Sequence, residues 1–142
     1  MIILENTTDL QVSIELLEKI ADTLTTRDIE LILCDDPSIQ YINKNFRYKN
    51  KPTDVLSFPI GGDRSNEPLG SIVISMDHVS AKAQELGHLP QDELALLFIH
   101  GLLHLLGHDH EKDHGEMRKE EERLIRRFDL PRSLIVRTED GA

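Results

Sequence analysis

The stretch FIHGLLHLLGHDHEKDH, from Phe98 to His114, holds five of the seven histidines of the chain. From Leu94 to Leu106 nearly every residue is apolar, which predicts a helix that is buried on all sides. His100 and His104 are four residues apart, so both imidazoles lie on one face of that helix. Two imidazoles in an apolar setting are costly unless each finds a partner, and a divalent cation is a partner that both can share.

The end of this helix supplies a third histidine. Gly107 predicts a helix end, because glycine readily adopts the left-handed conformation, and the reversal lets His110 return toward the histidine face. The spacing H-x-x-x-H-x-x-G-x-x-H is that of the zinc ligands in metzincin peptidases. Three histidines around a tetrahedral ion leave one position open for water, as in catalytic sites. We therefore predict one zinc ion per chain, bound by His100, His104 and His110.

The residue after the first histidine departs from the peptidase pattern. Such peptidases carry a glutamate there as general base, whereas this chain has Gly101. A glycine inside a helix costs about 0.5–1 kcal/mol relative to alanine, which indicates close approach of another element. A phosphodiester suits the site better than a peptide, because a metal and a cationic side chain stabilise its charged transition state. Asp109 is predicted either to orient a histidine or a water in catalysis, or to cap the turn after Gly107.

A basic segment, NKNFRYKNKP, runs from Asn43 to Pro52 and is followed by no acidic residue until Asp54. Its cations are Lys44, Arg47, Lys49 and Lys51, with Phe46 and Tyr48 between them. The net charge of the whole chain is −10, which argues against loose binding to phosphate backbones. Any nucleic-acid contact must therefore be local, and a solvated loop is the alternative interpretation of this segment.

Hydrophobic periodicity predicts a single α+β domain spanning residues 1–142, a mixed four-stranded sheet packed by about five helices with the zinc site on the central helix. The expected strands are Met1–Leu4, Ile29–Cys34, Val55–Ile60 and Ser71–Ser75. Helices are expected over about Leu10–Leu24, after Asp35, over Asp77–Leu86, from Pro90, and over about Gly115–Phe128. The early strand, helix, strand order predicts parallel neighbours, and the direct succession of the last two strands predicts an antiparallel pair. Pro59 favours an edge position for its strand.

Two helix faces and the lone cysteine complete these expectations. On the helix after Asp35, helical spacing points Phe46 inward with the isoleucines, and stacking of Phe46 or Tyr48 on a nucleic-acid base is the alternative. The charges of RKEEERLIRR, Arg118–Arg127, are interpreted as a solvated face with a Glu122–Arg126 pair. Cys34 excludes an internal disulfide and fits a core position in a reducing compartment. The first ten residues lack signal-peptide features and no run approaches the roughly 18 apolar residues of a membrane span, so a cytoplasmic location without a membrane partner is expected.

Three stretches together resemble the YbeY family, bacterial metal-dependent single-strand endoribonucleases that act in ribosomal RNA maturation and ribosome quality control. They are HGLLHLLGHDH (His100 to His110), FRYKNKPTDVLSFP (Phe46 to Pro59) and LGSIVIS (Leu69 to Ser75). The resemblance implies zinc at the three histidines, a functionally important Arg47, and guidance of the RNA by Lys44, Arg47, Lys49 and Lys51. It also implies a role in 16S rRNA 3′-end maturation, with single-stranded or ribosomal RNA, the small ribosomal subunit and its associated proteins as partners.

Two other functions stay open from the sequence. The ligand spacing favours a metallopeptidase-like hydrolase, against which Gly101 argues. A non-catalytic ribosome-assembly factor, in which a structural zinc holds His110 and the following loop in place, is the second.

Overall fold

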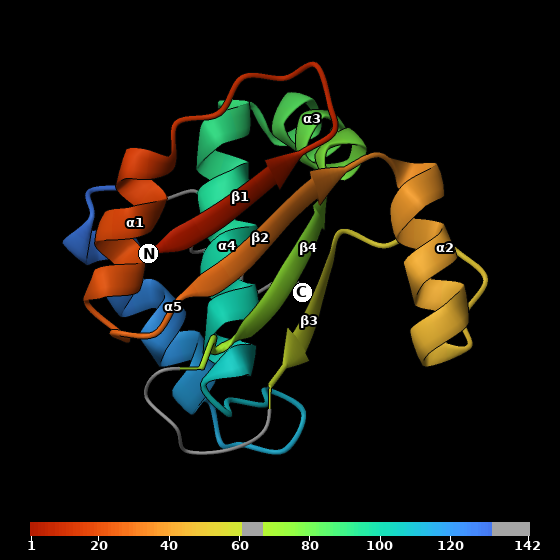
Figure 1. Ribbon diagram of the computed structural model, residues 1–142. Coiled ribbons are helices and arrows are strands. Elements are labelled where there is room, and N and C mark those ends of the chain that lie inside the picture. The colour runs from red at the N-terminus through yellow and green to blue at the C-terminus, as the bar shows by residue number, and fades with distance from the viewer. Residues whose placement is uncertain (61–66, 132–142) are drawn as a thin grey trace.

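Within the described part of the chain, four strands form one mixed sheet in the order β1-β2-β4-β3, flanked by five helices (Figure 1). The structure is a computed structural model that describes residues 1–60 and 67–131. Its elements are β1 (Ile2–Asn6), α1 (Ile14–Asp22), β2 (Ile29–Cys34), α2 (Asp36–Arg47), β3 (Val55–Pro59), β4 (Gly70–Ser75), α3 (Met76–Leu86), α4 (Pro90–Leu105) and α5 (Glu116–Arg127). The predicted α+β class is confirmed, as is the antiparallel pair at one edge of the sheet.

The order of the strands follows from their side chains. β1 pairs parallel with β2, and β2 pairs parallel with β4, whereas β3 pairs antiparallel with β4. The parallel prediction is therefore correct for β1 and β2 but wrong for β2 and β3, which β4 separates. β4 is the more apolar strand, with Ile72, Val73 and Ile74 all buried, and a strand covered on both faces belongs in the sheet interior. β3 contains Pro59, which lacks a ladder N–H, and occupies the edge as predicted.

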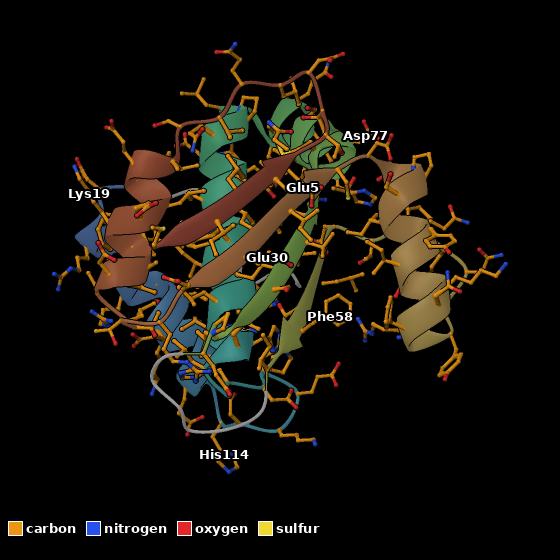
Figure 2. The ribbon with its side chains drawn as sticks, in the orientation of Figure 1. Glu5, Lys19, Glu30, Phe58, Asp77 and His114 are labelled. Carbon is orange, nitrogen blue, oxygen red and sulfur yellow. The ribbon has the colours of Figure 1, made fainter. Side chains whose placement is uncertain are left out.

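The two faces of the sheet are covered unequally. α1, α3, α4 and α5 contribute to the main core on one face, and α4 runs behind the strands in Figure 1. On the other face, α2 is the one helix of the described residues that packs, through a small cluster formed by Cys34, Ile39, Leu56 and Val73. Cys34 is buried, so its predicted core position is confirmed. Burial raises the pKa of its thiol to about 11, with smaller contributions from nearby aspartates, and the thiol therefore stays neutral. Figure 2 shows Glu5 and Glu30 on this second face, where β1 and β2 meet solvent.

Helix α1 is shorter than predicted. Residues 10–13 are not helical, and the helix begins at Ile14. The side-chain amide of Gln91 accepts a hydrogen bond from the backbone N–H of Ser13 (3.2 Å) and donates one to its carbonyl (3.1 Å). These contacts bind Ser13 to the start of α4, so a tertiary contact limits the helix that periodicity favoured.

Helix α4 is buried along most of its length, as its apolar sequence predicted. It packs against β3 and β4 on one side and contacts α1, α3 and α5 on the others. Within residues 1–60 and 67–131, none of the helices has both the length and the apolar character to cross a lipid bilayer.

Candidate metal centre

The C-terminal end of α4 turns the chain back toward its own histidines. Gly107 has a φ of +98°, and its N–H donates to the carbonyl of His104 (3.0 Å). The N–H of His108 donates to the carbonyl of Leu103 (2.9 Å), so the helix ends in a Schellman motif. The next turn brings the His110 ring to centroid distances of 5.5 Å from His100 and 5.6 Å from His104. The glycine reversal predicted from the sequence is thus present.

The three imidazoles converge at one point. The Nε2 atoms of His100 and His104 lie 3.1 Å apart, close to the separation of about 3.3 Å expected for two nitrogens bound to a tetrahedral zinc ion. One ring nitrogen from each of His100, His104 and His110 lies within 4.8 Å of the others. The first two rings are half-buried and the third is exposed, so the cluster is open on one side. This arrangement can hold a metal ion.

Hydrogen bonds at the far side of two rings determine which nitrogens are available. The Nδ1 of His104 lies 2.9 Å from the carbonyl oxygen of His108, which only accepts, so Nδ1 carries the proton. The Nδ1 of His100 likewise donates to Oε1 of Glu121 at 2.9 Å. Both Nε2 atoms are then lone-pair acceptors that face each other. Neither Nε2 atom carries a proton, so the two rings cannot hydrogen-bond to each other. A divalent cation between them accepts both lone pairs.

The environment of His104 also favours the metal-binding form of the ring. Burial lowers the pKa of His104 below its ordinary value of 6.5, and the neighbouring His100 adds to the shift. The ring is therefore neutral at physiological pH, as a metal ligand must be.

Glu121 on α5 is a site residue that the sequence interpretation missed. The solvated-face prediction for Arg118–Arg127 is wrong here, because Glu121 is only 5% exposed and its carboxylate bonds to His100. The predicted Glu122–Arg126 pair is present on the outer side of the helix. A signal existed in the helical spacing, since Glu121 shares the buried face of Met117, Leu124 and Ile125. A carboxylate on an apolar face needs a partner, and that partner is a histidine of the cluster.

We expect Glu121→Gln to lower zinc affinity about 10–100-fold, because a carboxylate that accepts from a ligand imidazole fixes the ring and raises its basicity. Competition with a chromophoric chelator measures this affinity. Glu122→Gln is the matched control, since Glu122 lies next in the chain but pairs with Arg126 in solvent. Equal zinc affinities for the two variants would show that Glu121 does not support the site.

The histidine cluster lines a cavity of about 490 Å³ between α4 and the edge strand β3. Arg47, Asp109 and His108 line the same cavity, with Ser57 and Pro59 from β3. The predicted lysines Lys44, Lys49 and Lys51 are exposed and are not among its lining residues. Asp109 accepts a hydrogen bond from the N–H of Glu111 (3.0 Å) through Oδ1, so the turn-capping alternative has a direct contact.

At Gly101, α4 approaches the sheet closely. A Cβ at this position would lie 2.9 Å from Cγ2 of Ile72 and 3.2 Å from Oγ of Ser57. The Ser57 hydroxyl donates to the Gly101 carbonyl (3.2 Å). The close approach inferred from the glycine is confirmed, and it leaves no room for the peptidase glutamate.

We expect Gly101→Glu to lower the free energy of unfolding by about 3 kcal/mol or more, since it combines overpacking with a buried carboxylate. Gly101→Ala adds only the methyl group and is expected to cost about 1–2 kcal/mol. Urea denaturation measures both. A Gly101→Glu protein with unchanged stability would show that this side of the helix accepts a side chain.

Comparison with known proteins agrees with this geometry. The family model described as Endoribonuclease YbeY matches residues 4–129. The chain belongs to the YbeY family. It is 55% identical to Endoribonuclease YbeY of Nautilia profundicola, covering 99% of this chain and all of that protein, and 57% identical to that of Aliarcobacter butzleri, covering 96% and 99%. A solution structure of a Thermotoga maritima protein, 27% identical, superposes with a TM-score of 0.62 over 90% of this chain and 89% of that one.

Membership of the YbeY family places the chain among endoribonucleases, which are hydrolases of phosphodiester bonds. Two of the three stretches that resemble the YbeY family contribute residues to the cavity. His100 to His110 supplies the imidazoles, and Phe46 to Pro59 supplies Arg47 and the β3 wall.

Proposed function

We propose that residues 1–142 form one catalytic domain, a zinc-dependent endoribonuclease specific for single-stranded RNA. The main support is the convergence of three imidazoles and one arginine on a single cavity. Two of the imidazoles present unprotonated Nε2 atoms toward each other, and a buried carboxylate supports one of them. This donor set suits zinc, and its open side leaves room for substrate.

His100, His104 and His110 would hold the zinc ion. When bound, the ion would act as a Lewis acid and would lower the pKa of water at the site toward neutrality. The chain's own residues do the rest. Glu121 and the His108 carbonyl keep two rings in the tautomer that binds metal. Arg47 binds the scissile phosphate and stabilises the charge that develops on it, because its planar guanidinium matches phosphate oxygens in pairs.

The metallopeptidase alternative loses its general base. A glutamate at position 101 would collide with Ile72, a fully buried residue of the central strand β4. The cavity presents Arg47 instead, a residue that suits an anionic substrate better than a neutral peptide. Asp109 is retained as a proposed catalytic residue through its Oδ2 atom. Its Oδ1 accepts the Glu111 N–H, whereas Oδ2 has a long ion pair of 4.0 Å with the exposed Lys112.

The cellular role we propose is maturation of the 3′ end of 16S rRNA and ribosome quality control in the cytoplasm, on the small subunit with its associated proteins. Lys44, Lys49 and Lys51 would guide the RNA strand toward the cavity by charge attraction, since they are exposed beside Arg47.

Parallel assays on casein and on a defined single-stranded RNA test the proposed activity. We expect the zinc-loaded protein to cleave the RNA and leave casein intact, and a chelator to abolish RNA cleavage. Cleavage of casein would favour the peptidase alternative. Bound zinc without turnover of either substrate would favour the non-catalytic assembly factor.

A further inference from the structure

Exposed aromatic rings gather on the basic segment. Among the described residues, the three aromatic side chains that lie mostly in solvent are Tyr41 (69% exposed), Phe46 (68%) and Tyr48 (91%). The prediction that Phe46 is buried is wrong, because it lies in the last turn of α2, beyond the small cluster that buries Ile39. Residues 37–53 contain these rings and four cations but no acidic residue. Aromatic side chains among cations are typical of surfaces that bind single-stranded nucleic acid.

Phe46 differs from the two tyrosines in being supported by another ring. Its centroid lies 5.6 Å from that of Phe58, at an interplanar angle of 64°, which is an edge-to-face contact. Phe58 is half-buried in β3 and lies between β3 and α2 in Figure 2. The Phe46 ring is therefore held in place on one side while most of it stays exposed.

The two aromatic residues are next to cavity-lining residues in the chain, although neither is itself a lining residue. Phe46 precedes Arg47, which lines the cavity, and Phe58 lies between two other lining residues, Ser57 and Pro59. Side chains alternate along a strand, so Phe58 points away from the cavity across the edge strand. An RNA strand bound at Arg47 would reach Phe46, the preceding residue of α2, if it left the cavity across the edge strand β3.

The segment that follows Phe46 is also fixed before RNA arrives. Asn43 is only 2% exposed. Its backbone carbonyl accepts hydrogen bonds from the backbone N–H groups of Tyr48 and Lys49. Its side-chain amide donates to the carbonyl of Lys51 (2.9 Å). Tyr48 takes the left-handed conformation, with a φ of 60°, to end the helix. These contacts order the basic segment around the aromatic ring.

We propose that Phe46, supported by Phe58, is a stacking platform for a base next to the bond that is cut, and that it contributes the preference for unpaired RNA. A base can stack on a side chain only when it is released from its own neighbours, which single strands allow and duplexes resist. This inference rests on the proposed RNA cleavage, and it assigns substrate selection to a residue outside the metal site.

The test compares Phe46→Ala, Phe46→Leu and Phe46→Tyr in the zinc-loaded protein. Binding of a single-stranded RNA carrying 2-aminopurine is followed by fluorescence, with RNA integrity checked on gels, and cleavage kinetics are measured on the unmodified RNA. We expect Phe46→Ala and Phe46→Leu to weaken single-strand binding about 5–100-fold and to raise KM with little change in kcat. Phe46→Tyr is expected to restore both, because it retains a π face. Duplex RNA binding, zinc content and melting temperature are expected to stay unchanged.

Tyr41→Ala is the matched control, since Tyr41 is equally exposed on the same helix but is not adjacent to a cavity residue. We expect it to change binding less than about 2-fold. Wild-type binding in Phe46→Leu, or equal losses in Tyr41→Ala and Phe46→Ala, would overturn the stacking proposal. Unchanged RNA binding in Phe46→Ala would overturn the stacking proposal and would favour contact of the exposed Phe46 ring with a protein partner. A wild-type protein that binds but does not cleave RNA would instead refute the proposed function.

Discussion

His104→Ala is expected to lose bound zinc and RNA cleavage together. His104 contributes one of the two Nε2 atoms that lie 3.1 Å apart, and its Nδ1 is bonded to the His108 carbonyl at the end of the same helix. Removing it leaves one half-buried and one exposed imidazole, too few to hold a catalytic ion. We expect zinc content to fall from about one ion per chain to near zero, and cleavage to fall at least about 10³-fold. Metal analysis and a gel-based RNA assay on the same preparation measure the two losses.

The control for this variant is His114→Ala. His114 belongs to the same histidine-rich stretch, but it is exposed, lies at the bottom of Figure 2 and is not one of the three clustered histidines. We expect His114→Ala to keep both zinc and activity. Full zinc occupancy in His104→Ala would contradict the ligand assignment, and cleavage that survives without zinc would point to a contaminating nuclease.

Arg47→Ala is expected to separate chemistry from metal binding. Arg47 is an exposed residue that lines the cavity from α2, an element that contributes no histidine to the cluster. Zinc content and thermal stability should therefore match the wild type. Loss of a preorganised donor to a charged transition state typically costs about 10²–10³-fold in turnover, and we expect a fall of that size in kcat. Arg47→Lys should recover only part of it, because an ammonium cannot make paired bonds to phosphate.

Lys49→Ala is the control for charge alone. Lys49 lies two residues from Arg47 but is not among the residues that line the cavity. Its removal should weaken RNA binding modestly and reduce the dependence of log affinity on log salt by about one, with kcat unchanged. An Arg47→Ala protein that loses zinc, or one that behaves like Lys49→Ala, would contradict the assigned role.

The features that were predictable from the sequence are local ones. The spacing of His100 and His104 needs only helical geometry, and the return of His110 needs only a left-handed glycine at position 107. The close contact at Gly101 followed from the cost of glycine in a helix. The edge position of β3 followed from the missing N–H of Pro59.

The features that were not predictable depend on contacts between distant segments. Helical spacing places Glu121 on the buried face of α5, but its hydrogen bond to His100 depends on how α5 docks on α4, which no spacing within α5 specifies. The late start of α1 coincides with hydrogen bonds between Ser13 and Gln91, which is 78 residues away in the sequence. Phe46 is exposed because the part of α2 that packs on the sheet ends before it. Periodicity shows which side of a helix a residue lies on, but not how much of the helix length is covered.

Zinc titration of the metal-free protein, with cleavage of a defined single-stranded RNA as the readout, tests the central claim most directly. We predict that chelator-treated protein is inactive, and that activity rises with added zinc until one ion is bound per chain and then stays constant. Mapping the RNA ends in the same assay shows which bond is cut. Full activity in the metal-free protein, or a plateau reached only with more than one ion per chain, would contradict a single zinc site built from three imidazoles.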